Sequence, residues 1–223
     1  ASQLFSEEDR KKVVSAIEQA EHKTSAELVT VVATVSGRYD RAEDIFGFLT
    51  AMLAVAAGWL TCSYFHPEAA WKLGAFFPVT GLLPVLVTMI GGFMAGSFLA
   101  TRFPTLRLPF IPAREFEEEV GRAARAAFMS SSIRKTDGGT GILLYVSLFE
   151  HRVVVLPDDT INEKLPGQDW QEVCDVIVAG MKSNQPAQAL ESAIARCGEI
   201  LGKPLPRQDE DVNELGNELI LID

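Results

Sequence analysis

Residues 45–65 read IFGFLTAMLAVAAGWLTCSYF, and residues 73–101 read LGAFFPVTGLLPVLVTMIGGFMAGSFLAT. Neither run contains a formally charged side chain. A helix of about 20 apolar residues crosses the hydrocarbon core of a bilayer, so each run is long enough to span a membrane. The connection between them, residues 66–72, is too short to be a domain. The two runs therefore predict a transmembrane helical hairpin, and we disfavour the alternative of buried helices in a soluble domain.

Basic residues near the ends of the two runs predict how the hairpin is oriented. The connection contains only Lys72, whereas the outer flanks contain Arg38, Arg41, Arg102, Arg107 and Arg114. Positive flanks face the cytoplasm. The sequence also begins without the basic and apolar regions of a secretory signal. We therefore expect a two-pass membrane protein with both termini in the cytoplasm.

Small residues in the second run indicate close packing between helices. Gly92 and Gly96 form a Gly-x-x-x-Gly motif beside Gly91, which suits close approach of another helix. Packing against the first run is the preferred interpretation, and association between subunits is the alternative. Neither run contains an ionisable side chain of the kind that transport pathways use, so a transporter is disfavoured.

The charge of the whole chain argues against a nucleic-acid partner. The formal net charge is −10, and binding phosphates requires a basic surface. The three cysteines, Cys62, Cys174 and Cys197, lack the spacing of a metal site. We expect them to act as small apolar side chains.

The soluble parts alternate between helical and strand patterns. We predict a helix after a capping box at Ser6-x-x-Asp9, a strand at residues 26–33, and a helix that begins near Pro112. Strands at 142–146 and 152–156 and two amphipathic helices follow. A small sheet covered by helices accommodates this order. The expected division is 1–42 and 102–202 for the interrupted domain, 43–101 for the hairpin, and 203–223 for an acidic tail. This tail either docks on a partner or folds back on its own domain.

Three aspartates at strand ends are the candidate metal ligands. Asp137 precedes the central strand, and Asp158 and Asp159 follow the returning strand. Loops at strand ends commonly bind ligands in α/β domains. Glu27 begins the first strand and joins them only if that strand starts at the same edge of the sheet. The preferred alternative is that the aspartates form turns, which short acidic side chains favour.

Several short stretches resemble the TPM domain family, in its branch with an inserted membrane hairpin. They are TSAEL at 24–28, TDGGTGILLYV at 136–146, HRV at 151–153, DDTI at 158–161 and DVNEL at 211–215. The resemblance implies a chain of the α/β class, a small α/β/α sandwich interrupted by a two-helix transmembrane hairpin. It also implies a location in the bacterial cytoplasmic (inner) membrane.

The resemblance implies two kinds of function. Members of the family serve in assembly or as receptor accessories, and some are acid phosphatases or calcium binders. Bacterial members accompany LemA-type membrane proteins and a second TPM-domain protein. We therefore expect a non-catalytic accessory or assembly protein that forms homo- or hetero-oligomers and needs no cofactor. The alternative is a phosphatase at the cytoplasmic membrane face, which would require a divalent cation such as Ca²⁺ or Mg²⁺.

Overall fold

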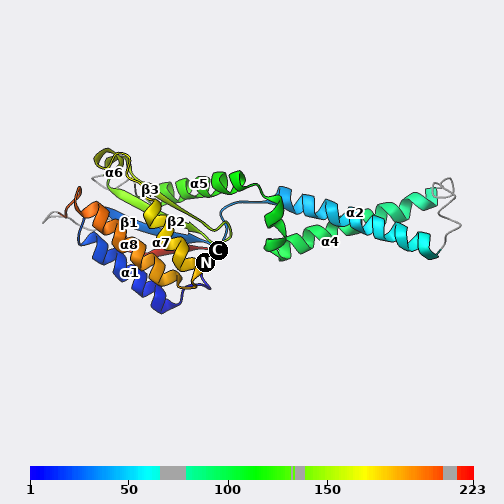
Figure 1. Cartoon of the computed structure of the whole chain (residues 1–223), viewed down its shortest axis with the longest axis horizontal. Coiled ribbons are helices and arrows are strands. Elements are labelled where there is room, and N and C mark those ends of the chain that lie inside the picture. The colour runs from blue at the N-terminus through cyan, green and yellow to red at the C-terminus, as the bar shows by residue number, and fades with distance from the viewer. Residues whose placement is uncertain (66–78, 132, 134–138, 208–214) are drawn as a thin grey trace. The chain divides into compact units, whose positions relative to one another are not determined.

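The computed structural model describes residues 1–65, 79–131, 133, 139–207 and 215–223 (Figure 1). The predicted connection at 66–72 and Asp137 lie outside these residues. The chain forms two compact units. One unit comprises Ala1–Gly37 and Phe116–Asp223, and the other comprises Arg38–Glu115.

The first unit is built on a four-stranded sheet in the order β3-β2-β1-β4. β1 and β2 are parallel, β4 is parallel to β1, and β3 is antiparallel to β2. The strands are β1 (Glu27–Ala33), β2 (Gly141–Ser147), β3 (Arg152–Pro157) and β4 (Leu219–Ile222). Every residue of β1 and β2 is buried. This explains why these strands are largely apolar on both faces instead of alternating.

Helices cover both faces of the sheet, as Figure 1 shows. The helices of this unit are α1 (Glu7–Glu21), most of α5 (Ala113–Ser130), α6 (Asp159–Lys164), α7 (Gln171–Lys182) and α8 (Pro186–Gly202). α1, α7 and α8 share one apolar core with Leu28 and Ile142. α5 forms a second core with Val31 and Leu143 on the other face. The predicted α/β/α sandwich is confirmed.

The C-terminal residues fold back onto their own domain, which resolves one alternative that the sequence leaves open. Leu219–Ile222 form β4, where Thr30 pairs with Leu219 and Ala33 pairs with Ile222. The apolar end of the acidic tail therefore extends the sheet.

A buried hydrogen-bond network lies where β1 ends. Glu150 is 5% exposed, and its Oε1 accepts hydrogen bonds from the backbone N–H groups of Ser36 (2.9 Å) and Gly37 (3.2 Å). Its Oε2 accepts a hydrogen bond from the Ser147 hydroxyl. The Ser36 hydroxyl also lies 3.0 Å from the Tyr145 hydroxyl. The network fixes the segment through which the chain leaves the sheet.

The second unit consists mainly of two long helices, α2 (Asp40–Phe65) and α4 (Val79–Arg102), followed by the 3-10 helix η1 (Pro104–Phe110). Glu43, near the start of α2, accepts a hydrogen bond from Thr101, near the end of α4 (3.3 Å). Glu43 also forms an ion pair with Arg107 of η1. The start of α2 therefore lies beside the end of α4, and the helices are antiparallel.

Both helices are long and apolar enough to cross a membrane, over Asp40–Thr61 and Leu82–Arg102. In the most apolar stretches of these segments only 11% and 6% of the residues are buried. A helix from the core of a soluble domain would be mostly buried, so this exposure agrees with the predicted hairpin.

The glycines of α4 differ in their surroundings. A Cβ atom on Gly96 would lie 2.7 Å from Thr50 Cβ, and one on Gly92 would lie 2.9 Å from Ala51 Cα. A Cβ atom on Gly91 would meet no heavy atom within 4 Å. Of the three glycines predicted to pack helices, Gly92 and Gly96 thus face α2, and Gly91 faces open space.

We predict that Gly96→Ala separates the two helices and lowers the thermal unfolding midpoint of the detergent-solubilised chain. Overpacking of a close contact costs about 1–3 kcal/mol, which corresponds to a shift of several degrees. Circular dichroism during heating measures this shift. Gly91→Ala is the matched control and should leave the midpoint unchanged. Equal midpoints for the two variants would contradict the packing described.

Candidate functional site

The two described aspartates of the predicted metal site lie in different surroundings. Asp158 is 7% exposed and is the N-cap of α6, where its side chain accepts a hydrogen bond from the Asp159 N–H (2.8 Å). Asp159 is exposed. Asp158 therefore has the local structural role that was considered as the alternative to metal binding. This role does not test whether Asp158 also binds a metal ion.

Glu27 and Asp158 lie at the same end of the sheet, where β1 begins and β3 ends. Glu27 pairs with Gly141 in the parallel register of β1 and β2, and the Asp158 N–H donates to the Gly141 carbonyl (2.8 Å). Adjacent strands are about 4.8 Å apart, so the Cα atoms of Glu27 and Asp158 are separated by about 10 Å. Both side chains are buried, with 8% and 7% exposure.

Glu21 is a buried carboxylate that the sequence analysis missed. It is the last residue of α1 and is 9% exposed. Its Oε1 accepts a hydrogen bond from the Leu28 N–H (3.0 Å), whereas its Oε2 is buried without a hydrogen-bond partner. Together with Glu27 it lines a cavity of about 210 Å³ at the start of β1.

Burial, and after it the negative charge of Glu27, raise the pKa of Glu21, which lies at about 7. The hydrogen bond from Leu28, the side chain of Asn217 and the charge of Arg207 lower this pKa without restoring the ordinary value. A carboxyl group with a pKa near neutrality exchanges its proton under physiological conditions, which is common at functional sites.

Metal-ligating groups of three are absent from the described part of the chain. Among residues 1–65, 79–131, 133, 139–207 and 215–223, no three His, Cys, Asp or Glu side chains lie close enough to hold a metal ion. Within that part, Glu27 and Asp158 are the two buried carboxylates that lie at the strand ends where the metal site was predicted.

The cysteines and histidines contribute no nucleophile in the described structure. Burial raises the pKa values of the Cys174 and Cys197 thiols, which keeps them protonated and unreactive. His22 hydrogen-bonds to Arg207, and His151 occupies the turn before β3 with a φ of 51°. Cys174 and Cys197 behave as the small apolar side chains expected.

The β3 edge of the sheet presents backbone groups away from β2. Asp158 donates to Gly141, and hydrogen-bonded pairs alternate along an antiparallel ladder. In the register of β2 and β3, the N–H and C=O groups of residues 152, 154 and 156 therefore face β2. Those of Val153 and Val155 face outward. The Val153 carbonyl accepts a weak hydrogen bond from the Cys174 thiol, at 3.9 Å.

A groove of about 310 Å³ runs along this edge between α5 and α7. Its apolar lining is Val120 of α5, Val153 and Val154 of β3, and Cys174 and Val178 of α7. The rest of its lining is polar and consists of Glu117, His151, Arg152 and Gln171, of which Glu117 forms an ion pair with Arg152 (3.8 Å). The groove thus combines apolar surface with outward backbone donors and acceptors, which is the chemistry that an added strand requires.

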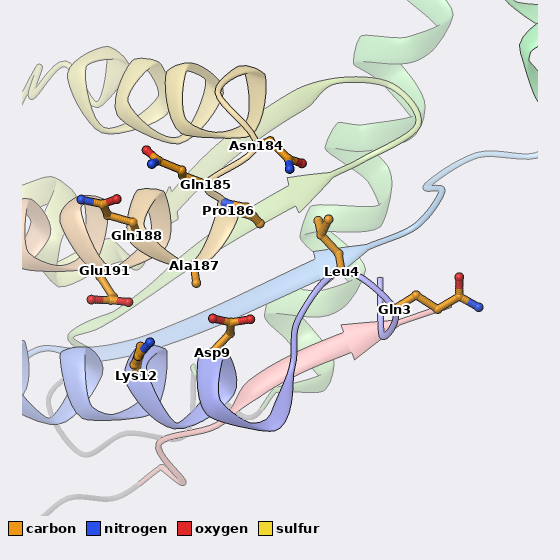
Figure 2. A pocket seen from close by; sticks show the side chains of 10 residues that line it. All are labelled: Gln3, Leu4, Asp9, Lys12, Asn184, Gln185, Pro186, Ala187, Gln188 and Glu191. Atoms are coloured by element: carbon orange, nitrogen blue, oxygen red, sulfur yellow. The ribbon is translucent and has the colours of Figure 1, made fainter.

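A larger and more polar groove of about 420 Å³ lies beside the N-terminal segment (Figure 2). In Figure 2 the side chain of Glu191 on α8 extends toward Lys12 on α1. Asp9 forms the predicted capping box with Ser6, and Lys12 pairs with Glu8 (3.0 Å). These charged groups stabilise helix α1, and the groove brings together no set of catalytic side chains.

The first unit is a four-stranded sheet with helices on both faces. It therefore belongs to the class of α/β/α sandwiches. Residues 110–200 match the model of the TPM domain family. This match includes β2, β3, α6 and α7, and therefore the β3 edge and Asp158. The match leaves β1, Glu21 and Glu27 outside it.

The whole chain is similar in fold to one solved protein. The NMR structure of the BA42 protein from the psychrophilic bacterium Bizionia argentinensis has 17% sequence identity to this chain and a TM-score of 0.57. The similarity covers 97% of this chain and 94% of that one. At this identity the likeness establishes the fold alone. No curated protein sequence matches this chain.

We predict that Glu21 makes the stability of the protein depend on pH. A carboxyl whose pKa is raised by folding, here from 4.5 to about 7, binds more protons in the folded chain than in the unfolded chain. The free energy of unfolding therefore falls as the pH rises through this window. Glu21→Gln should remove this fall and make the variant more stable than the wild type at pH 8.

Urea unfolding followed by near-ultraviolet circular dichroism at pH 5 and pH 8 measures this effect. Glu163→Gln changes an exposed carboxylate of α6 and is the matched control. A wild-type pH dependence that survives Glu21→Gln would contradict the assignment.

Proposed function

We propose that this chain is a membrane-anchored accessory or assembly protein whose α/β domain binds extended segments of partner membrane proteins. The observation that carries the proposal is the β3 edge, where outward backbone groups lie beside an apolar groove. A polypeptide that adds to a sheet edge gains affinity from main-chain hydrogen bonds and selectivity from side-chain pockets.

The chemistry of the groove indicates the kind of segment that would bind. Val120, Val154 and Val178 offer apolar contact, so every second side chain of an added strand would be aliphatic. Glu117 and Arg152 pair with each other, which leaves little net charge to favour an acidic or a basic segment. An uncharged, alternately apolar segment therefore matches the groove best.

The hairpin supports an anchoring role and a location at a membrane. α2 and α4 are long enough to cross a bilayer, and few residues of their most apolar stretches are buried. The arginines at their outer ends favour a cytoplasmic position for the α/β domain. Partners that share this membrane face include the LemA-type proteins and other TPM-domain proteins to which the family resemblance points.

We predict that Val178→Glu weakens partner binding by about tenfold, because it places an unpaired carboxylate in the apolar groove. The measurement is native purification in mild detergent, followed by mass determination and identification of the co-purifying chains. Ala179→Glu adds the same charge at the neighbouring exposed position of α7, outside the groove lining, and should retain the partners. A wild-type chain that purifies as a monomer without partners would overturn the proposed function.

A divalent-metal-dependent phosphatase at the cytoplasmic membrane face is the second candidate function. It is favoured by the burial of Glu27 and Asp158 at one edge of the sheet. These two carboxylates would hold the cation, whose charge would polarise a phosphoryl oxygen and activate water. The exposed Asp159 lies beside them in the sequence.

For this candidate we predict turnover of p-nitrophenyl phosphate with Mg²⁺ or Ca²⁺ and a loss of at least about tenfold in Asp158→Asn. Asparagine retains the capping of α6 but removes the charge. Phosphate release measured by absorbance tests this, with Glu163→Gln as control. No turnover with any divalent metal would eliminate the phosphatase.

A further inference from the structure

The cavity at the end of α1 is lined by a buried carboxylate oxygen that accepts no hydrogen bond. Glu21 is more than nine-tenths buried and lines the cavity, and its Oε2 accepts no hydrogen bond. A buried oxygen without a donor is unfavourable, and more so when it is charged. A ligand that supplies an N–H group and a positive charge would remove this cost.

The walls of the cavity are rich in acceptors. Glu18, Glu21 and Glu27 supply carboxylates, and Asn217 supplies an amide. The volume of about 210 Å³ equals that of about seven water molecules in the liquid. A planar guanidinium or a short aminoalkyl group is smaller than this volume and fits within it.

We propose that this cavity binds an organic cation with N–H donors, a primary ammonium or a guanidinium group, through Glu21 and Glu27. Each N–H of such a group can donate to a different carboxylate, and charge-assisted hydrogen bonds are about twice as strong as neutral ones. Because the carboxylates of Glu21 and Glu27 repel each other, one positive charge between them stabilises both.

The donor geometry favours an organic cation over a metal ion. Oε1 of Glu21 is already bonded to the Leu28 N–H. In the described residues no three ligating side chains converge as a metal ion would need. Arg207 shows that a guanidinium group fits against this wall, where it hydrogen-bonds to His22. The charge of Arg207 lowers the pKa of Glu21, but burial outweighs it and the pKa stays raised.

Binding should depend on pH, since only the ionised form of Glu21 attracts a cation. Among the described residues, the charged and titratable groups that line the cavity with Glu21 are Glu18 and His22 at the end of α1, Glu27 of β1 and Arg207 after α8. With a pKa of about 7, Glu21 is protonated in a large share of molecules at neutral pH. Binding of the cation therefore releases protons near pH 7, and affinity rises as the pH rises above it.

Isothermal titration calorimetry of the full chain in detergent micelles tests the proposal, with ethylguanidinium chloride as the probe. We expect binding at pH 8 that weakens at pH 6, with proton release at pH 7 seen as a difference in heat between two buffers of unlike ionisation enthalpy. Glu21→Gln should lower the affinity about tenfold or more. Glu163→Gln should leave it unchanged.

A blocked peptide, acetyl-Gly-Arg-Gly-amide, distinguishes the two sources of such a cation. Tighter binding of the peptide than of ethylguanidinium identifies a basic side chain of a protein as the ligand. Tighter binding of ethylguanidinium identifies a free small cation. Both results support the site when they depend on Glu21.

Three results would overturn the site. They are no heat with either probe, binding that Glu21→Gln does not weaken, and Glu21-dependent binding of Ca²⁺ or Mg²⁺ without binding of the organic cations. If Glu21→Gln alters the circular dichroism spectrum, Glu18→Gln replaces it, because Glu18 is exposed and also lines the cavity. Val178→Glu should not affect the probes, so failure here is distinguishable from failure at the β3 groove.

Discussion

The parallel pairing of β1 with β2 is the constraint on which the rest of this structure depends. Two parallel strands cannot be joined by a tight turn, so the chain must return from the end of the first strand to the start of the second. Here the return includes α2, α4 and α5 before β2 begins at Gly141. The apolar hairpin is therefore inserted into a connection that the sheet already required. This explains how a long apolar hairpin interrupts the domain without interrupting its sheet.

Two buried glutamates, Glu150 near the end of β1 and Glu21 near its start, illustrate the difference between a structural and a functional carboxylate. Glu150 has hydrogen bonds on both oxygens, from Ser36, Gly37 and Ser147. Such a carboxylate is fully compensated for its burial, and its role is to hold the segment that follows β1. Glu21 has a hydrogen bond on one oxygen only, and its pKa is raised. An incompletely satisfied buried charge is unfavourable unless a ligand or a proton completes it.

Local patterns in the sequence predict much of this fold because they report burial directly. Residues 142–146 are apolar on both faces, as a central strand requires, and Leu190, Ile194, Cys197 and Leu201 repeat at helical spacing and are all buried. Ser6 and Asp9 likewise form the predicted capping box, which involves only residues three apart.

Features that depend on distant contacts were not predicted. β4 has only four residues within an acidic tail, and its strand conformation arises from pairing with β1, far away in the sequence. Glu21 resembles a solvated residue in the last turn of a helix. It becomes buried in a cavity that Glu27, Arg207 and Asn217 also line, and these residues come from three other parts of the chain. A helical pattern carries no information about such neighbours, so the candidate site was predicted only in part, through Asp158 and Glu27.

The two edges of the sheet differ in a way that favours one of them for association. β4 is short, and the charged residues Glu218 and Asp223 flank it. Short strands with flanking charges are a common protection against addition of another strand. β3 is longer and has three consecutive valines, and the groove beside it is lined by apolar side chains together with the paired Glu117 and Arg152. A protein that only needed to remain soluble would be expected to protect both edges. The unequal protection is therefore best understood if β3 is the edge that receives a partner.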